Sequence, residues 1–316
     1  MSYKVFIDGS TGTTGLPIHE RLAGRPELEL IAIEESRRKD PTAKAECLNA
    51  ADVAFLCLPD EAARESAAMV TNANTVLIDA STAHRTHAEW VYGLPELGAE
   101  YREALPGAKR IANVGCHASA FILGVAPLVR AGIVPMDTRL SCFSITGYSG
   151  GGKAMIAEYE AAERPATLNS PRAYATGLTH KHLPEMWQHT GLKYAPLFNP
   201  IVGPFRQGLT VTVPLHLPEL PGSPTLEEIQ AVLALAYTGS VFVRVLPLGD
   251  PANLDGTAVD PQACNGTNRA DVMVWGNEEQ ATVVVRIDNL GKGASGSAVQ
   301  CMNLSLGLAE DAGLTV

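Results

Sequence analysis

The stretch YKVFIDGSTGTTG, residues 3–15, decides the fold. Its first six residues are apolar and β-prone, and the glycines after them open a segment, residues 15–24, that is compatible with a helix. Glycine permits the tight turn and the close backbone approach that a pyrophosphate needs, and the phosphates then lie against the positive end of the helix. Gly9, Gly12 and Gly15 are spaced GxxGxxG rather than GxGxxG, so the dinucleotide-binding fingerprint is met in part. A plain strand-to-helix turn also favours glycine, but this position after the first strand favours nucleotide binding.

The alternation of strand-like and helix-like segments continues beyond this turn. Helix formers dominate residues 60–70, and a long apolar run at 117–132 is also compatible with a helix. Near-continuous apolar strands separated by helices indicate a parallel sheet that is covered on both faces. The strand candidates of this part are residues 28–34, 51–58, 75–81 and 109–115.

After about residue 135 the pattern changes to longer strands of a mixed or antiparallel sheet, with a hairpin turn at residues 276–279. The tail, residues 293–312, has helical spacing and is expected to pack back on the first domain. We therefore predict an α/β protein. A Rossmann-like parallel-sheet domain, residues 1–116 and 291–316, would hold the cofactor, and an inserted α+β domain, residues 117–290, would carry catalysis and dimerisation. The later strand candidates are 139–146, 209–217, 241–248, 271–275 and 281–288, with helices at 152–163 and 225–237.

Composition limits the classes of partner. A chain of 316 residues is long enough for two domains. The net charge of −10, from 34 acidic and 24 basic residues, argues against a nucleic-acid or anionic-membrane binder. The N-terminus lacks the pattern of a signal peptide, and no window approaches the ~20 apolar residues of a membrane helix. Six cysteines without a CxxC pair indicate reduced thiols. We predict a cytoplasmic protein whose partner is a small molecule, with no membrane or nucleic-acid contact.

The end of the second strand bears on the choice of cofactor. An acidic residue there suits the ribose 2′-hydroxyl of NAD, whereas arginine accommodates the 2′-phosphate of NADP. Glu34 favours NAD, but Ser36, Arg37 and Arg38 can hold a phosphate by charge-assisted hydrogen bonds. A solvated charged loop is the plain alternative. We predict NADP.

Cys116 differs from the other cysteines because it lies where a strand meets the N-terminus of a helix. Unpaired backbone N–H groups and the helix dipole stabilise a thiolate there, and the same groups can stabilise an oxyanion. Cys57 and Cys142 lie inside apolar strands and have no such advantage. A small buried residue in a turn is the alternative for Cys116, and context must decide.

A second cluster is THKHLPEM, residues 179–186. His180 and His182 form an HxH pair that could bind metal, but no third ligand of the usual spacing completes a zinc site. In the other interpretation, His182 precedes a helix whose first turn contains Pro184 and Glu185, and Glu185 orients His182 as an acid/base.

Two further glycine-rich junctions join strands to helices. In GYSGGGK, residues 147–153, backbone amides together with Lys153 can hold an anion. This is not a P-loop, because Lys153 precedes Ala154 instead of serine or threonine; a flexible turn is the alternative. NLGKGASG, residues 289–296, is the second junction.

Together, these motifs resemble the shorter form of the N-acetyl-gamma-glutamyl-phosphate reductase family, within the aspartate-semialdehyde dehydrogenase-like superfamily, over essentially the whole chain. Two departures stand out: Val114, His117 and Ala118 replace Pro, Tyr and Pro of the family's NPGCYP motif, and Lys181 replaces Arg of its HRH motif. The matching stretches are the glycine turn, Asp79–Arg85 (DASTAHR), Tyr92–Glu96 (YGLPE), Asn113–Cys116, His180–Glu185 (HKHLPE) and Asp288–Gln300.

The resemblance implies an enzyme of arginine biosynthesis that reduces N-acetyl-γ-glutamyl phosphate to the semialdehyde with NADPH, through a thioester on Cys116. It implies that His182, together with His180 or alone, serves as the acid/base, and that Arg85 and the loop from Ser149 to Lys153 recognise phosphate. We expect a homodimer or homotetramer, and no metal. Three alternatives stay open: a reductase of aspartyl or N-acetylaminoadipyl phosphate, a non-catalytic NADP-sensing protein, and a zinc protein.

The site residues that follow from these interpretations fall into three groups. The catalytic residues are Cys116, His182, His180 and Glu185. Cofactor contacts are expected from Gly9, Ser10, Thr11, Gly12, Thr13, Thr14, Gly15, Ser36, Arg37, Arg38, Cys57, Leu58, Pro59, Ser81 and Asn289. Substrate contacts are expected from Arg85, Asn113, Ser149, Gly150 and Lys153.

Overall fold

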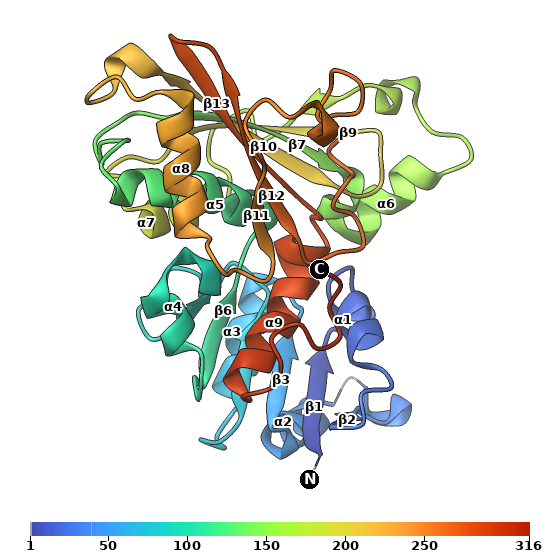
Figure 1. The fold of residues 1–316 in the computed structure, drawn as a ribbon. Helices are drawn as coiled ribbons and strands as arrows, with labels where there is room; N and C mark the ends of the chain where they lie inside the picture. The colour runs from blue at the N-terminus through green and yellow to red at the C-terminus, as the bar shows by residue number, and fades with distance from the viewer. Residues whose placement is uncertain (1, 39) are drawn as a thin grey trace. The chain divides into compact units, whose positions relative to one another are not determined.

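The computed structural model describes residues 2–38 and 40–316, and the chain divides into two compact units (Figure 1). The first unit contains the residues up to Pro95 together with Ala99–Val114 and Ala294–Leu314. The second contains Glu96–Gly98, Gly115–Gly293 and Thr315–Val316. The chain therefore leaves the first unit directly before Cys116 and returns to it near the C-terminus.

The first unit is built on a six-stranded sheet in the order β2-β1-β3-β4-β6-β5, in which every neighbouring pair is parallel. β2 and β3 pair with opposite sides of β1, so the direction in which the sheet grows reverses there. In open α/β sheets, ligands bind outside the carboxyl ends of the strands at such a reversal. The strands are β1 (Tyr3–Asp8), β2 (Leu28–Ile31), β3 (Val53–Leu56), β4 (Val76–Asp79), β5 (Val91–Gly93) and β6 (Arg110–Asn113).

The C-terminal helix α9 (Gly296–Ser305) completes the core of this unit. Val299 and Met302 are fully buried in one cluster with Val5, Phe55 and Ile111. These contacts make α9 part of the core of the first unit. The other helices of the unit are α1 (Gly15–Leu22), η1 (Glu35–Arg37), α2 (Pro41–Ala50), α3 (Asp60–Ala68) and α4 (Ala99–Ala104), and the short helix η2 (Pro95–Leu97) lies at its boundary.

Two predictions about this unit were incomplete. The second strand ends at Ile31 instead of residue 34, and helix α2 was not predicted. Its start signals are nevertheless present, because the Asp40 side chain accepts a hydrogen bond from the Thr42 N–H at 2.8 Å and Pro41 occupies the first turn.

The second unit contains a seven-stranded sheet in the order β11-β12-β13-β10-β7-β9-β8. The pairs β7·β9 and β11·β12 are parallel and the others antiparallel, so the predicted mixed sheet is confirmed. β9 was not predicted, since Pro200 in its middle argues against a strand. The strands are β7 (Ser141–Gly147), β8 (Arg172–Ala173), β9 (Leu197–Gly203), β10 (Leu209–His216), β11 (Val243–Val245), β12 (Ala270–Gly276) and β13 (Gln280–Ile287).

Helix α5 (Cys116–Arg130) packs on one face of this sheet, and its side chains are buried on every side. Gly124 permits the close approach, because a Cβ at that position would lie 3.0 Å from Val285 and 3.2 Å from Val283. The other helices of the unit are η3 (Tyr148–Gly151), α6 (Gly152–Glu160), η4 (Ala166–Asn169), α7 (Leu183–Thr190), η5 (Leu217–Glu219), α8 (Leu226–Ala236), η6 (Pro251–Asn253) and, at its boundary, the π-turn η7 (Gly291–Ser295).

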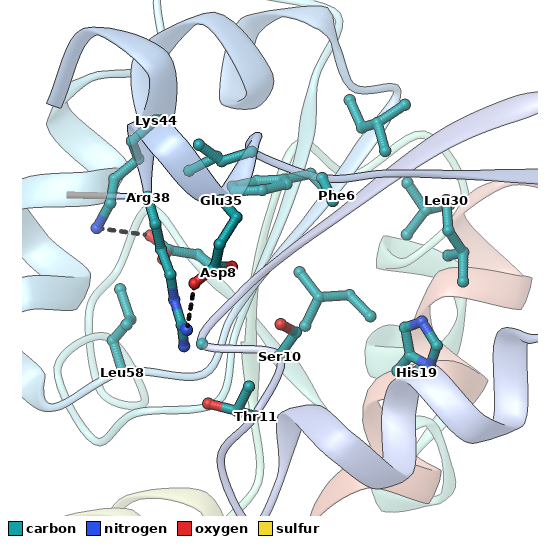
Figure 2. A pocket seen from close by; sticks show the side chains of 16 residues that line it. Phe6, Asp8, Ser10, Thr11, His19, Leu30, Glu35, Arg38, Lys44 and Leu58 are labelled. Carbon is teal, nitrogen blue, oxygen red and sulfur yellow. Dashed lines mark hydrogen bonds and ion pairs between the residues drawn. The ribbon is translucent and has the colours of Figure 1, made fainter. Parts of the chain in front are cut away.

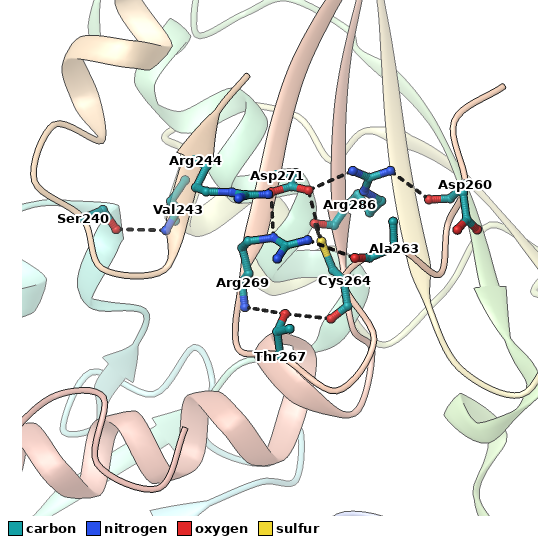
Figure 3. Close-up of polar contacts among 10 residues, drawn as sticks. All are labelled: Ser240, Val243, Arg244, Asp260, Ala263, Cys264, Thr267, Arg269, Asp271 and Arg286. Atoms are coloured by element: carbon teal, nitrogen blue, oxygen red, sulfur yellow. Dashed lines mark hydrogen bonds and ion pairs between the residues drawn. The ribbon is translucent and has the colours of Figure 1, made fainter. Parts of the chain in front are cut away.

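A buried carboxylate, Asp271, joins β11, β12 and β13 through three arginines (Figure 3). Its oxygens lie 2.8 Å from Arg244, 3.0 Å from Arg269 and 2.8 Å from Arg286. Burial alone would raise the pKa of Asp271, but the hydrogen bonds from Arg286 and Arg244 and the charge of Arg269 lower it overall. The carboxylate therefore stays ionised and neutralises part of a dense positive cluster.

The other face of the sheet exposes apolar side chains. On β7 and β9, Phe143, Ile145 and Leu197 are 45%, 40% and 52% exposed, whereas the alternate residues Ser144 and Phe198 are buried. Across the described parts of the chain, no helix combines the length and the apolar character that crossing a bilayer requires.

Candidate active site

Cys116 is the first residue of α5, as the sequence predicts, and its side chain is partly exposed. Gly115, the residue that caps the helix, is extended (φ −91°, ψ 143°). Gly293 lies directly against the cysteine, because a Cβ there would be 2.6 Å from the Cys116 Cβ. The glycine-rich junction that follows β13 is thus packed against the base of the cysteine side chain.

Glu185 connects the two helices of this site. Its carboxylate accepts a hydrogen bond from the Gly115 N–H at 3.1 Å, and the side chain is 1% exposed. Because Glu185 lies in the first turn of α7 and Gly115 caps α5, this bond joins the start of α7 to the start of α5. The Gly115 N–H is therefore occupied and does not serve as an oxyanion donor. The predicted orientation of His182 by Glu185 stays a prediction.

The histidines 180 and 182 lie together directly before α7, and His182 is buried. Their ring centroids are 4.7 Å apart, with an interplanar angle of 87°. The backbone N–H of His182 donates to Nδ1 of His180 at 3.1 Å. An accepting Nδ1 needs a lone pair, so neutral His180 carries its proton on Nε2.

Three residues that the sequence analysis did not assign to the site join this cluster: His117, Ser144 and Tyr174. The His117 ring centroid lies 5.5 Å from that of His180 and 5.6 Å from that of His182. Its Nδ1 lies 2.7 Å from the Ser144 Oγ, and its Nε2 lies 2.8 Å from the Tyr174 hydroxyl. The only sequence signal was His117 itself, which departs from the family motif next to the cysteine.

The loop that carries Tyr174 and His180 is held in an unusual backbone conformation. Ala175 and Leu178 both have left-handed φ angles, 50° and 56°, and the Leu178 N–H donates to the Ala175 carbonyl at 2.9 Å. Each such residue costs about 1–2 kcal/mol compared with the right-handed form. Strain of this kind gathers at functional loops, where the surrounding contacts must hold it.

Asn289 connects the glycine-rich junction at residues 289–296 to the one at residues 147–153. Its amide Nδ2 donates to the Ser149 Oγ at 2.9 Å, and its Oδ1 accepts from the Gly208 N–H at 2.8 Å. Ser149 is buried, whereas Lys153 is exposed at the start of α6. Substrate contacts by Ser149, Gly150 and Lys153, and a cofactor contact by Asn289, stay predictions.

A cavity of about 490 Å³ lies at the carboxyl end of β1 in the first unit (Figure 2). Gly9, Ser10, Thr11 and Leu58 of the predicted cofactor set line it. Gly9 has φ +87°, and a Cβ there would lie 2.3 Å from the Cys57 carbonyl oxygen. Only glycine therefore allows the turn to run this close to the end of β3, as a pyrophosphate-binding turn requires.

Of the two arginines that were predicted to contact the cofactor, the structure places one in the lining of this cavity. Arg38 lines the cavity, but Arg37 does not appear in its lining and is held by Asp40 at 2.9 Å and Glu46 at 2.8 Å. The hydrogen bonds that Arg37 donates to Glu46 and Asp40 raise the pKa of its guanidinium.

Lys44 is a second cation in the lining, paired with Asp8 at 3.0 Å. Sequence reasoning missed it because the residue lies on α2, the helix that was not predicted. Ser36 is exposed within η1.

Arg85 is buried beneath the strand that leads to the cysteine. Its Nε donates to the Asn113 carbonyl at 2.9 Å, and its Nη2 donates to the Ala80 carbonyl at 3.1 Å. Ser81 donates to the Asp79 carboxylate at 2.7 Å. These contacts give the DASTAHR segment a role in holding the end of β6, and the predicted contacts of Ser81 and Arg85 with cofactor and phosphate stay untested.

The chain is similar to known proteins along almost its whole length. The family described as "Semialdehyde dehydrogenase, NAD binding domain" matches residues 4–105, and "Semialdehyde dehydrogenase, dimerisation domain" matches residues 116–289. The chain is 46% identical to N-acetyl-gamma-glutamyl-phosphate reductase 2 of Nostoc sp., over 98% of this chain and 99% of that protein. The chain belongs to the N-acetyl-gamma-glutamyl-phosphate reductase family. A second reductase of this name, from Pseudomonas putida, is 46% identical over 96% of both chains.

The family's fold is also found in more distant proteins. Aspartate semialdehyde dehydrogenase II from Vibrio cholerae has a TM-score of 0.72 at 18% identity, covering 96% of this chain and 98% of that one. The family and the fold predicted from the sequence are thus confirmed. Within the described ranges, no group of three or more His, Cys, Asp or Glu side chains is arranged to hold a metal ion.

Proposed function

We propose that this chain reduces N-acetyl-γ-glutamyl phosphate to N-acetylglutamate semialdehyde with NADPH, in arginine biosynthesis, through a thioester on Cys116. The observation that carries the proposal is the hydrogen bond between Glu185 and Gly115. It joins the helix start that bears the cysteine to the helix start that bears His182. The named activity of relatives at 46% identity supports the substrate.

The first half of the reaction is acyl transfer to sulfur. The Cys116 thiolate, at the positive end of α5, attacks the acyl carbon of the substrate. The new S–C bond gives a tetrahedral oxyanion, and its collapse breaks the C–O bond and releases inorganic phosphate. Amide groups of the first turn of α5 are suited to stabilise the tetrahedral oxyanion, with the Gly115 N–H excluded because Glu185 occupies it.

The second half is reduction and collapse. Bound NADPH would supply a hydride to the thioester carbon, and a proton given by His182 would complete the thiohemiacetal. His182 then takes the hydroxyl proton of the thiohemiacetal as the C–S bond breaks, which releases the semialdehyde and the Cys116 thiolate. We assign this role to His182, because protonation of His180 at Nδ1 would oppose the His182 N–H that already donates there.

The cofactor is assigned to the cavity at the end of β1. Gly9, Ser10 and Thr11 would hold the pyrophosphate by their backbone, and Leu58 lies at the adjacent strand end. Arg38 would hold the 2′-phosphate, with Lys44 as an additional positive charge. These two cations favour NADPH over NADH.

Self-association is proposed through the exposed face of the second sheet. Phe143, Ile145 and Leu197 form an apolar surface of a kind that marks protein interfaces, and the matching family domain is described as a dimerisation domain. A homodimer, or a tetramer built from such dimers, would cover this surface. We also assign the protein to the cytoplasm, which accords with six cysteines that all remain thiols.

The test is a reductase assay run in the phosphate-dependent oxidative direction, with NADP and NAD compared side by side. Three semialdehydes are supplied: those derived from N-acetylglutamate, aspartate and N-acetylaminoadipate. The proposal expects the N-acetylglutamate semialdehyde and NADP to give the highest kcat/KM, and Cys116→Ser to abolish turnover while NADP binding is retained. Preference for another semialdehyde would reassign the substrate, and normal turnover of Cys116→Ser would reject the thioester.

A further inference from the structure

We infer that His117 is a positioning residue that accepts the hydrogen bond donated by the Tyr174 hydroxyl, so that the Tyr174 oxygen can act toward the Cys116 site only as a hydrogen-bond acceptor. The family motif has tyrosine at position 117, so this link belongs to the histidine that replaces it here. The direction of the hydrogen bonds does not depend on the proposed function. Only the effect of this direction on the reaction of Cys116 rests on that function.

The evidence begins with a continuous chain of four groups. The Tyr174 hydroxyl lies 2.8 Å from His117 Nε2, and His117 Nδ1 lies 2.7 Å from the Ser144 Oγ. The Ser144 hydroxyl in turn donates to the Thr210 carbonyl at 3.0 Å. His117 and Ser144 are buried at 3% and 0% exposure, so water does not compete for these bonds.

The hydrogen bond from the Ser144 hydroxyl to the Thr210 carbonyl determines the direction of the other two. Ser144 has one hydroxyl proton, and giving it to the Thr210 carbonyl leaves its oxygen to accept from His117 Nδ1–H. A neutral imidazole with its proton on Nδ1 has a lone pair on Nε2. Tyr174 must then donate its proton to Nε2. In the opposite direction, Ser144 and the Thr210 carbonyl would face each other as two acceptors.

A doubly protonated His117 would also satisfy the chain, and it would leave the Tyr174 proton for the site. Burial, followed by the charge of His180, lowers the pKa of His117 to about 3. Its contacts with Phe198 and with the rings of His180 and His182 offer no carboxylate that would favour the cation. The neutral form, with a single direction of bonding, therefore prevails at physiological pH.

Tyr174 contacts the residue that directly follows the reactive cysteine, because its hydroxyl lies 2.8 Å from Nε2 of His117. Burial and then the charge of Cys116 raise the pKa of the phenol, which keeps it protonated beside a thiolate. Its ring centroid is also 5.9 Å from that of His180, whose proton is on Nε2. A tyrosine whose only proton is committed to His117 does not stabilise the thiolate as a donor, so the nucleophilicity of Cys116 is preserved.

The direct test reads the tautomer of His117. Wild-type protein labelled with ¹⁵N-histidine is measured by NMR between pH 5 and 8, and the His117 signals are assigned by their loss in His117→Gln. We expect a neutral ring with Nδ1 protonated at every pH, and a shift of the unprotonated Nε2 resonance in Tyr174→Phe. A ring protonated on Nε2, or one that titrates in this range, would overturn the inference. This result does not depend on the identity of the substrate.

A second measurement reads the consequence at the cysteine. In His117→Phe, the Tyr174 hydroxyl loses its acceptor, and its proton becomes available for donation to the Cys116 thiolate. The pH midpoint for alkylation of Cys116 by iodoacetamide should then fall by about one unit, the size expected for one hydrogen bond to a charged group. The double variant His117→Phe/Tyr174→Phe should return the midpoint toward that of wild type.

Two controls keep the second measurement decisive. His216→Gln, an exposed histidine at the end of β10, should leave the midpoint unchanged. Thermal unfolding of each variant shows whether it is folded, and the NMR test on wild type holds if His117→Phe is not. A shift that is the same with and without Tyr174 would show a packing effect and reject the positioning role.

Discussion

Replacing Arg38 by methionine should weaken the preference for NADPH, whereas the same change at Arg37 should not. Sequence alone makes the two arginines equivalent candidates for the 2′-phosphate. In the structure Arg38 lines the cofactor cavity together with Glu35, which lies 3.4 Å from it, whereas Arg37 is held by Asp40 and Glu46. The pair therefore forms a matched test, in which two adjacent residues of the same type lose the same charge.

The expected size follows from the exposure of the site. The Arg38 side chain is 58% exposed, so its interaction with a phosphate about 4 Å away is screened nearly as in water, at about 1 kcal/mol for each unit of charge. A 2′-phosphate carries close to two charges at neutral pH, which gives about 1.5–2 kcal/mol, or roughly a 10- to 30-fold rise in KM for NADPH. NADH lacks this phosphate, so its KM should change little.

The assay is steady-state kinetics with each cofactor, in parallel for wild type, Arg38→Met and Arg37→Met. The effect on Arg38→Met should diminish as ionic strength rises, because exposed charges are screened. Equal losses in the two variants would show that the charge of the whole segment, and not the cavity position, determines specificity. An equal rise in KM for NADPH and NADH in Arg38→Met would refute the assignment to the 2′-phosphate.

Three further predictions concern stability, each measured by chemical denaturation. Glu185→Ala leaves the buried Gly115 N–H without its acceptor and should lower the free energy of unfolding by about 1–3 kcal/mol, whereas Glu185→Gln keeps an acceptor and should lose less; equal losses would contradict this. Asp271 has a lowered pKa, so its contribution is present above its unfolded pKa of about 3.9 and is lost as pH falls further. Asp271→Asn should therefore be less stable at pH 7 and lose less on acidification than wild type; parallel pH profiles would count against the ion cluster. Ala175→Gly should stabilise by up to about 1 kcal/mol because it removes a left-handed alanine, while Ala173→Gly in β8 should not; destabilisation at both positions would reject the strain.

Much of the fold could be predicted because the local sequence patterns agree with the way the elements pack in the structure. The glycine turn follows a buried strand, and the apolar tail has the periodicity of the helix that completes the first core. Where the signals conflict, the prediction failed. Pro200 argues against a strand, yet β9 forms between β7 and β8. Helix α2 has a good cap at Asp40, but its amphipathic pattern is too weak to be noticed.

For the candidate site, the sequence indicated which residues take part but not which contacts they make. Cys116 could be identified from the sequence because the unpaired N–H groups and the dipole at a helix N-terminus stabilise a thiolate. The hydrogen bond that the Gly115 N–H donates to Glu185 joins residues far apart in the chain, and so does the contact of His117 with Ser144 and Tyr174. No spacing rule contains them, because they depend on how β7, α5 and the loop before α7 pack. Likewise, the hydrogen bond from the His182 N–H to Nδ1 of His180 depends on the path of the backbone between the two residues.

The position of α9 has a consequence for the order of events on the ribosome. The parallel sheet emerges first, but Val299 and Met302, which close its core, are synthesised only after Gly115–Gly293 of the second unit. At about 5–20 residues per second, the nascent sheet waits roughly 10–40 seconds for that helix, with an apolar surface uncovered. The second unit holds its own core and can fold during this interval. Translation speed between Gly115 and Gly293 therefore determines how long the nascent cofactor domain is exposed to aggregation and to chaperones.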